Sequence, residues 1–303
     1  MCAGNLCYQI LGHTVATNLE FPGLAPVSVE TPDFAFTVCH TRPAVLQYEL
    51  DKSVSWLQSP ELSEFEIIPA ARSVVCYPSP TATTDYTRYY FLNEVFPLCL
   101  SLTEVVLHAS AVLVSATAAV GFIGTSGSGK STLAASFSQH GATLLADDCL
   151  PLVTDAGQVS CRPGLPDLRL RNDTFLRLGF PSDAGRPIAR DEDKRQVSHS
   201  PHALPQSVPL VRIYRLMPIG GDSGIEIGSV DWNVGFRDLM DCTYRVGEPD
   251  REQLAADFQR LAALAATGLL RRLSYPHDFE RLDRVREAVL ADVGAARPRG
   301  QEG

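Results

Sequence analysis

The sequence has few lysines, no closely spaced pair of cysteines and no long run of purely apolar residues. The last two absences argue against particular classes of protein. Only three of the 26 basic residues are lysines, so arginine carries most of the positive charge. The eight cysteines form no C-x-x-C pair, which argues against a zinc site or a disulfide framework. The longest uncharged run, residues 109–129, is long enough to span a membrane but is rich in Ser, Thr and Gly. We interpret it as buried strands.

Composition and charge favour a folded protein with no nucleic-acid partner. Of the 303 residues, 45% are hydrophobic and 20% are charged, which is typical of globular chains. The 35 acidic residues outweigh the basic ones and give a net charge of −9, the wrong sign for binding nucleic acid. The first ten residues, MCAGNLCYQI, contain no basic leader followed by an apolar run. We therefore expect a cytoplasmic protein with no membrane partner.

The distribution of apolar runs and turn residues predicts two domains and a tail. Residues 1–95 contain short β-prone runs separated by prolines and predict a small β-rich amino-terminal domain. Residues 96–295 change character to long β-branched runs and predict an α/β catalytic domain. Residues 296–303 predict a flexible tail.

Within the second domain, the order of elements around residue 124 is the most informative. Two predicted strands, Val105–Ser115 and Ala118–Ile123, precede a glycine-rich loop and a predicted helix, Ser131–His140. Further along, residues 186–202 are polar and charged and predict a surface loop. An amphipathic stripe of apolar residues predicts a helix that packs on a sheet, and its members are Leu254, Phe258, Leu261 and Ala265.

The glycine-rich loop matches the phosphate-binding pattern G-x-x-x-x-G-K-[ST]. Its residues are Gly124, Thr125, Ser126, Gly127, Ser128, Gly129, Lys130, Ser131 and Thr132. Glycines allow consecutive backbone N–H groups to turn toward phosphate oxygens, and a helix that begins there favours negative charge. Lys130 is expected to reach the outer phosphates of ATP, and the Ser131 hydroxyl is expected to be a Mg²⁺ ligand.

Two adjacent acids, Asp147 and Asp148, follow the apolar stretch ATLLA after the predicted helix. Successive side chains of a strand point to opposite sides, so an extended backbone would give the two acids separate roles. One would hold magnesium, and the other would face an incoming hydroxyl group. The alternative interpretation is an ordinary acidic turn at the end of a strand.

Two further candidates depend on pairings that sequence alone does not determine. His108 lies in an apolar run 16 residues before the loop, and it would come close to the phosphates if the two predicted strands formed a hairpin. The charged run Asp191–Arg195 is either solvated surface or a source of cationic side chains for the site.

The order of these motifs closely resembles the catalytic core of the bacterial HPr kinase/phosphorylase family. The shared features are a histidine before the loop (His108-Ala109-Ser110), the loop GTSGSGKST, and the segment HGATLLADDCLPL. The resemblance implies a P-loop kinase core with a mixed sheet and flanking helices, preceded here by the β-rich domain. It also implies that Asp148 accepts the proton of the substrate hydroxyl, that Asp147 assists with the metal, and that His108, Lys130 and Arg195 are catalytic.

More of the chain resembles a divergent branch of this family, found with peptide natural-product pathways and including kinases of lasso-peptide precursors. The similar segments are ILGHTVATNLEFPGL, PGLPDLRLRND, Asp193-Lys194-Arg195 and RRLSYPHDFERLD. The family's Arg-Gly-Leu-Gly segment, which supplies a second magnesium ligand, has no counterpart. These observations lead to the hypothesis of an ATP- and Mg²⁺-dependent kinase that phosphorylates a serine of a peptide or protein. A small-metabolite kinase and a non-catalytic nucleotide sensor are the alternatives.

Overall fold

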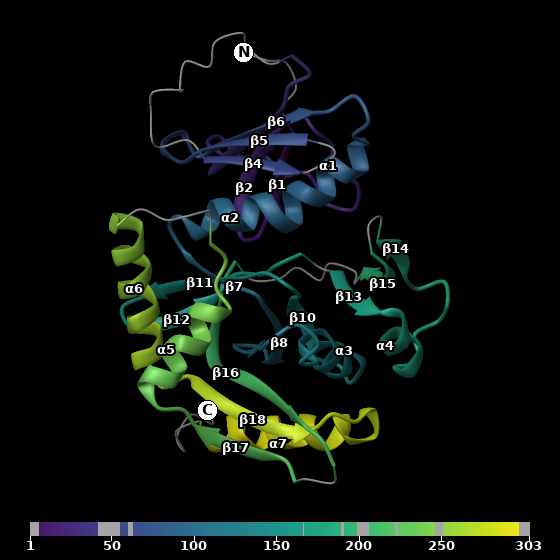
Figure 1. The fold of residues 1–303 in the computed structure, drawn as a ribbon, viewed down its shortest axis with the longest axis vertical. Helices are drawn as coiled ribbons and strands as arrows, with labels where there is room; N and C mark the ends of the chain where they lie inside the picture. The colour runs from purple at the N-terminus through teal and green to yellow at the C-terminus, as the bar shows by residue number, and fades with distance from the viewer. Residues whose placement is uncertain are drawn as a thin grey trace. The chain divides into compact units, whose positions relative to one another are not determined.

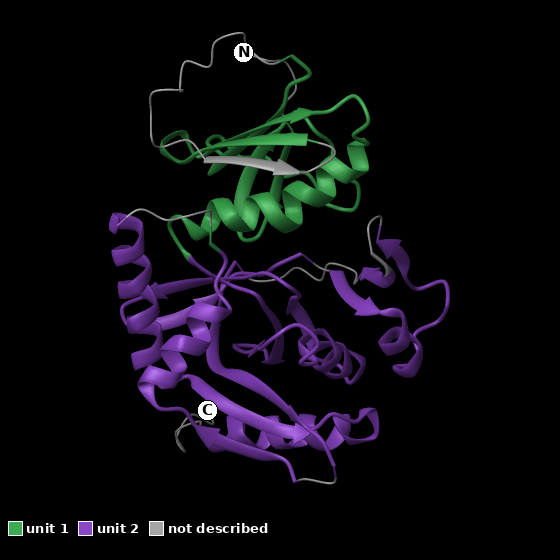
Figure 2. Cartoon of the chain, in the orientation of Figure 1, with its two compact units in different colours: residues 1–104, 245–249 green, residues 105–244, 250–303 purple. Residues whose placement is uncertain are grey.

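The chain folds into two compact units, each with its own sheet (Figure 2). The computed structural model describes residues 6–41, 55–59, 63–165, 167–188, 191–198, 206–221, 224–245 and 251–296. The first unit comprises residues 1–104 and 245–249, and the second comprises residues 105–244 and 250–303. Residues 297–303, most of the expected tail, lie outside the described residues.

The first unit is built on a mixed sheet with strand order β1-β2-β3-β6-β5-β4 (Figure 1). β2, β3 and β6 are parallel, and the other pairs are antiparallel. The strands are β1 (Leu6–Ile10), β2 (His13–Thr17), β3 (Phe34–Val38), β4 (Ser55–Ser59), β5 (Ser63–Ile68) and β6 (Ser73–Pro78). A short 3-10 turn, Pro69–Ala71, connects β5 to β6.

Aromatic side chains attach the helical segment of this unit to its sheet. The segment comprises α1 (Thr84–Tyr90), a π-helical turn (Phe91–Val95) and α2 (Phe96–Ser101). The rings of Phe36 and Phe91 stack with centroids 3.7 Å apart, and Phe96 packs edge-on against Phe34. Because these rings join the core of the first unit, the units divide after residue 104, whereas the sequence placed a boundary near residue 95.

The second unit contains a larger mixed sheet, with the path β10-β8-β9-β16-β12-β11-β7 and with β18 and β17 joined beyond β16. β9, β16 and β18 are parallel. The strands are β7 (Val105–Leu107), β8 (Ala109–Ser115), β9 (Ala118–Ile123), β10 (Thr143–Ala146), β11 (Leu150–Asp155), β12 (Gln158–Cys161), β16 (Val208–Ile219), β17 (Glu226–Ser229) and β18 (Leu270–Pro276).

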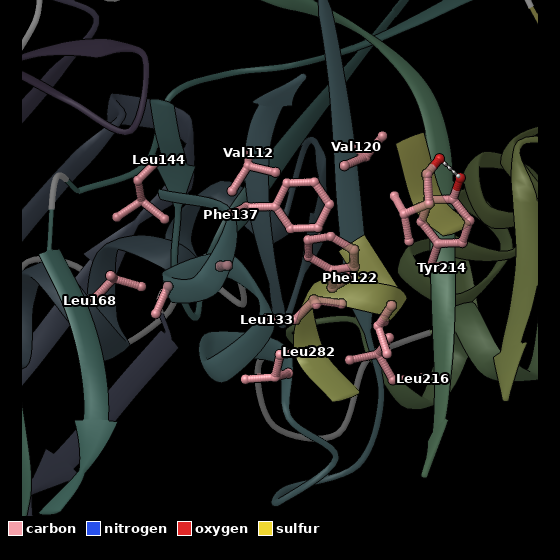
Figure 3. Packing of buried hydrophobic residues seen from close by; sticks show 14 of the residues in the cluster. Val112, Val120, Phe122, Leu133, Phe137, Leu144, Leu168, Tyr214, Leu216 and Leu282 are labelled. Carbon is pink, nitrogen blue, oxygen red and sulfur yellow. Dashed lines mark hydrogen bonds between the residues drawn. The ribbon is translucent and has the colours of Figure 1, made fainter. Parts of the chain in front are cut away.

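Helices cover both faces of this sheet. The helices of the unit are α3 (Lys130–Gln139), α4 (Asn172–Arg177), α5 (Trp232–Asp241), α6 (Arg251–Ala266) and α7 (Leu282–Ala296), with a 3-10 turn at Phe279–Arg281. Alternate residues of β9 enter two separate cores, as the period of a strand requires. Val120 and Phe122 pack with residues of α3 and α7 (Figure 3), whereas Ala119 and Ile123 pack with residues of α5 and α6. β9 is therefore buried on both sides where it leads into the glycine-rich loop.

The predicted strand Val105–Ser115 is interrupted at His108. β7 pairs with β11, whereas β8 pairs with β9 in the hairpin that the sequence left open, with Ala109 opposite Ile123. The backbone N–H of His108 donates to the carbonyl of Cys242 instead of joining either ladder. The interruption places His108 at the end of β8, across from the start of the loop.

The charged stretch 186–202 is not the surface loop that its composition predicts, because its described part forms strands. β14 (Arg186–Ile188) and β15 (Asp191–Ser198) make a three-stranded antiparallel sheet with β13 (Asp167–Arg171), in the order β13-β15-β14 (Figure 1). Pairing with β13 gives the backbone N–H and C=O groups of β15 hydrogen-bond partners. In a surface loop, water would have to supply these partners.

The apolar stripe of α6 is buried only in its second half. Leu261 is 2% exposed, whereas Leu254 and Phe258 are 49% and 54% exposed. The expectation that the whole stripe packs on a sheet is therefore wrong. Phe258 instead packs against Phe236 of α5, with ring centroids 5.0 Å apart.

Candidate active site

The glycine-rich loop connects the end of β9 to the start of α3, and its glycines are required by close contacts. Gly124 and Gly129 both have positive φ values, +158° and +91°. A Cβ atom on Gly124 would lie 2.4 Å from the Ser128 hydroxyl oxygen, and one on Gly129 would lie 2.7 Å from the Tyr275 hydroxyl oxygen. A larger residue at either position would force the loop or the contacting side chain to move.

Tyr275, near the end of β18, holds the loop through a hydrogen bond to its backbone. Its hydroxyl group donates to the carbonyl of Ser128 at 2.5 Å, and burial raises its pKa to about 12, so it remains a donor. The Ser128 hydroxyl oxygen is buried and has no hydrogen-bond partner within the described part of the chain. A buried hydroxyl without a partner is costly, so this atom indicates a place where a ligand oxygen would be stabilised.

Lys130 is the first residue of α3 and folds back over the loop. Its Nζ donates to the carbonyls of Gly124 at 2.9 Å and Thr125 at 3.3 Å, and the residue is only 8% exposed. Burial lowers its pKa, although the neighbouring Asp148 acts to raise it. Residues 125–127 are exposed. The loop thus has an exposed stretch at residues 125–127, and the Lys130 cation is buried against the carbonyls at its start.

A second support joins the loop to α5. The backbone N–H of Gly124 donates to the sulfur of Cys242, which also accepts from Arg215 at 3.7 Å. Nε of Arg215 lies 3.2 Å from the carboxylate of Asp238. Burial raises the pKa of the Cys242 thiol, so this cysteine acts as a packed neutral neighbour of the loop.

Asp147 follows β10 and is held among hydrogen-bond donors. Its carboxylate accepts from the Ser110 hydroxyl at 2.5 Å, from the backbone N–H of Arg169 at 2.8 Å, and from the side chain of Ser131. The residue is 5% exposed. Burial, with the nearby charge of Asp148, raises its pKa above the ordinary value. The contact with Ser131 brings Asp147 to the start of α3.

Asp148 lies beside it but is more accessible, with a side chain 27% exposed. One carboxylate oxygen lies 3.1 Å from Nε2 of His108, and the other accepts from NH1 of Arg169 at 2.9 Å. Its φ is +74°, a left-handed conformation that costs energy for a residue with a Cβ. This turn breaks the strand alternation, so both acids contact Arg169 instead of pointing to opposite sides as an extended backbone would require.

Tyr244 fixes this strained turn. Its hydroxyl group donates to the carbonyl of Asp148 at 3.1 Å and lies 3.3 Å from Nδ1 of His108. Burial lowers the pKa of His108, whereas Asp148 acts to raise it. The imidazole is thus held at both nitrogens between a tyrosine and a carboxylate.

The structure brings together five of the predicted residues, namely His108, Lys130, Ser131, Asp147 and Asp148. It places Arg195 elsewhere, on β15, where Nε donates to the side chain of Asn172 at 2.9 Å and the guanidinium lies over the ring of Phe175. Arg169 contacts both acids instead, and no motif in the sequence points to it. The only sequence signal for it is the alternation Leu-Arg-Leu-Arg in residues 168–171, which puts Arg169 on a polar face.

The donor set fits a nucleotide with magnesium. No group of three or more His, Cys, Asp and Glu side chains that could hold a metal occurs in the described residues. Magnesium beside phosphates needs no such group, because it keeps several waters and takes one or two protein oxygens. Ser131 and Asp147 provide such oxygens, and the loop amides and the unpartnered Ser128 hydroxyl suit phosphate oxygens.

Comparisons with solved structures reveal a distant structural similarity. No protein-family model matches the sequence, and no curated protein matches it significantly. Among the described residues, no helix has the length and apolarity needed to cross a membrane. The solved HPr(Ser) kinase/phosphatase from Coxiella burnetii is similar over 63% of this chain and 99% of its own, with 11% identity and a TM-score of 0.32. The chain is a mixed α/β protein by its own elements, and its resemblance to this kinase/phosphatase is distant.

Proposed function

We propose that the protein is an ATP-dependent kinase that transfers a phosphoryl group to a serine hydroxyl of a peptide or protein. The observation that carries the proposal is the meeting of Lys130 and Ser131, at the start of α3, with Asp147, Asp148 and His108 in one cluster. A cation and backbone amides for phosphates, beside a carboxylate for a proton, are the groups that phosphoryl transfer requires.

The loop side of the cluster would hold the donor. Bound MgATP supplies the terminal phosphoryl group, and magnesium offsets part of its negative charge. The backbone amides of residues 124–132 and Nζ of Lys130 would bind phosphate oxygens once Lys130 leaves the carbonyls of Gly124 and Thr125. Ser131 and Asp147 are the residues that we propose as magnesium ligands.

The other side of the cluster would receive the acceptor hydroxyl. Asp148 is the more exposed of the two acids, and we propose that its carboxylate accepts the hydroxyl proton. His108 and Arg169 each contact one of its oxygens and hold the group in a single orientation. Arg169 is our candidate for the role that the sequence resemblance gave to Arg195, because Arg169 contacts both acids.

A mass measurement tests the proposal. The purified protein is incubated with MgATP and serine-containing peptides, in parallel with a panel of hydroxyl-bearing metabolites, and intact masses are recorded. We expect phosphate addition to a peptide serine and loss of that addition with Asp148→Asn, while nucleotide binding persists. Transfer to metabolites alone would replace the peptide acceptor by a small molecule. Nucleotide binding with no transfer to any acceptor would favour a non-catalytic nucleotide sensor over a kinase.

A further inference from the structure

The three-stranded sheet β13-β15-β14 has two faces of different chemistry. In the pairing of β13 with β15, Leu168 is opposite Val197, and Leu170 is opposite Arg195. Arg169, between the two leucines, is opposite Gln196. Directly opposed residues of an antiparallel pair project to the same face. Leu168, Leu170 and Val197 are buried in the core around α3. The face that carries Arg169 is therefore the outer one.

Positive side chains gather on this outer face. Arg171 is directly opposite Lys194, and Arg186 of β14 is directly opposite Gln196, the neighbour of Arg169. The side chain of Arg171 is 65% exposed, and Arg186 is also exposed. We refer to the set as the cationic face, and it consists of Arg169, Arg171, Arg186 and Lys194.

Two features distinguish the cationic face from ordinary surface. Like charges directly opposite each other destabilise a sheet, yet Arg171 and Lys194 are so placed, in a chain whose net charge is −9. Acids also lie beside these cations, and Asp148 pairs with Arg169 at 2.9 Å, so the charge that the face presents comes from its other three members. Asp167 accepts from Gln196 at 2.6 Å, and Asp173 lies 3.6 Å from Nε of Arg171 in an ion pair with both side chains 65% exposed, which water screens strongly.

The cationic face is continuous with the candidate active site. Arg169 contacts Asp148 through its guanidinium and Asp147 through its backbone, and Arg171 follows two residues later on the same face. Two residues of a strand span about 7 Å, so the face begins at the acids and extends outward by roughly the spacing of two peptide side chains.

We propose that the cationic face binds acidic side chains of the acceptor peptide, so that the preferred serine is flanked by aspartate or glutamate. The proposal rests on the proposed kinase function for the identity of the site, but the binding itself does not require phosphoryl transfer. Positive charge at exposed positions pairs with carboxylates and steers a negatively charged partner toward the site.

The test measures binding and transfer separately on the full chain. Two fluorescein-labelled short peptides are used, one with a serine flanked by four glutamates and a matched one with four glutamines. The double variant Arg171→Gln, Lys194→Gln is compared with the matched double variant Arg272→Gln, Arg284→Gln, which removes two exposed arginines from β18 and α7. Arg169 is left intact because it contacts the acids. Fluorescence anisotropy gives the affinities, and nucleotide binding is measured in each variant.

We expect the glutamate peptide to bind about tenfold more tightly than the glutamine peptide at low salt, with the difference shrinking at high salt. The double variant in the cationic face should remove most of the difference, whereas the control variant should keep it. Equal binding of the two peptides, or equal loss in both variants, would overturn the proposal. A loss of nucleotide affinity in the Arg171 and Lys194 variant would also overturn it, because the face would then serve the nucleotide.

The two proposals fail in different ways. Transfer to both peptides at equal rates, in every variant, would leave the kinase function standing without the docking face. Charge-dependent peptide binding with no transfer to any serine would leave the docking face standing without the kinase function.

Discussion

Two carboxylates of the second unit have similar partners but occupy different settings. Asp292, on α7, accepts from the hydroxyl of Tyr214 at 2.8 Å and pairs with Arg212 and Arg271 at 3.3 and 3.1 Å. Asp148 likewise has an arginine and a tyrosine as neighbours, with a histidine in place of the second arginine. The types of the neighbouring residues therefore do not distinguish a carboxylate with a structural role from one in a candidate active site.

The settings differ in backbone, burial and neighbours. Asp292 lies within a regular helix, and its side chain is 14% exposed, whereas Asp148 has a left-handed backbone and a side chain 27% exposed. Only Asp148 lies next to the lysine of the glycine-rich loop. Strain is kept where surrounding contacts hold it in place, and it often occurs at functional sites. Asp292 therefore fastens α7 to β16 and β18, whereas Asp148 has the strained backbone and the exposure expected of the general base that we propose.

The largest expected effect comes from replacing Asp148 and Asp292 by asparagine, because one variant should lose activity and the other stability. Asp148→Asn should lower phosphoryl transfer by about 10² to 10⁴, the usual contribution of a general base, and should keep the fold, since Asn tolerates left-handed backbone. Asp292→Asn should instead lower the free energy of unfolding by about 1–3 kcal/mol, because two half-buried arginines lose the charged acceptor of their hydrogen bonds. Steady-state kinetics and urea unfolding measure the two effects. Equal kinetic losses in both variants would contradict the distinction.

A second prediction concerns the loop and uses two glycines with almost equal φ values. Gly129→Ala adds a Cβ atom 2.7 Å from the Tyr275 hydroxyl, whereas Gly141→Ala meets nothing within 4 Å, although φ is +91° and +89° at the two positions. Both variants should lose about 1–2 kcal/mol of stability from backbone strain. Only Gly129→Ala should also weaken ATP binding, by more than about tenfold, measured by calorimetry.

The companion variant Tyr275→Phe makes the loop prediction sharper. It removes the hydroxyl oxygen that the new methyl group would meet, so it should restore part of the ATP affinity in the Gly129→Ala background. Because Tyr275→Phe also removes the hydrogen bond to Ser128, the single variant Tyr275→Phe is the reference. An affinity of the double variant no higher than that of Gly129→Ala, although Tyr275→Phe alone binds ATP normally, would indicate that backbone strain and not the contact with Tyr275 disturbs the loop.

A smaller effect is expected from the two tyrosines of the comparison. Tyr244→Phe removes the hydroxyl group that contacts Asp148 and His108, and it should lower kcat by about 5- to 30-fold, equivalent to 1–2 kcal/mol, with KM unchanged. Tyr214→Phe should leave kcat unchanged and lower the free energy of unfolding by about 1 kcal/mol. If both variants change only stability, Tyr244 is a structural residue.

The local part of the site could be predicted from the sequence, because each of its signals lies within a few residues. The loop pattern, the strand before it and the helix after it depend on neighbouring residues, and β9 and α3 lie where the pattern placed them. The hairpin of β8 and β9 was only one possible pairing of the two β-prone runs, and the structure shows that it forms.

The rest depended on contacts between distant parts of the chain. Arg169 reaches Asp148 across 21 positions and Tyr244 reaches it across 96, and no local pattern indicates either contact. β15 contains mostly charged residues, so it is a strand because β13 and β14 pair with it, not because of its own composition. The role first given to Arg195 rested on its place in a charged run. That place does not predict which face of the strand the side chain occupies.

The smallest expected effect concerns the pH dependence of stability, which should have opposite signs at two other carboxyl groups. Burial raises the pKa of Asp238 above 3.8, although Arg215 acts to lower it. At Asp33, burial also acts to raise the pKa, but hydrogen bonds from the backbone and hydroxyl of Thr14 outweigh it and lower the pKa. The stability linked to Asp238 is therefore complete below 3.8 and is lost as the pH rises through its raised pKa. The stability linked to Asp33 is present above 3.8 and is lost as the pH falls through its lowered pKa.

Replacing each group by asparagine should reveal the two signs in urea unfolding across a pH series. Asp238→Asn should be more stable than the parent at neutral pH, and Asp33→Asn less stable, each by under about 1 kcal/mol because both groups are partly solvated. Both differences should shrink toward acid pH, where the parent carboxyls are protonated. The same sign in both variants would show that the salt bridge with Arg215 outweighs burial at Asp238, which would make Asp238 a brace of the kind that Asp292 represents.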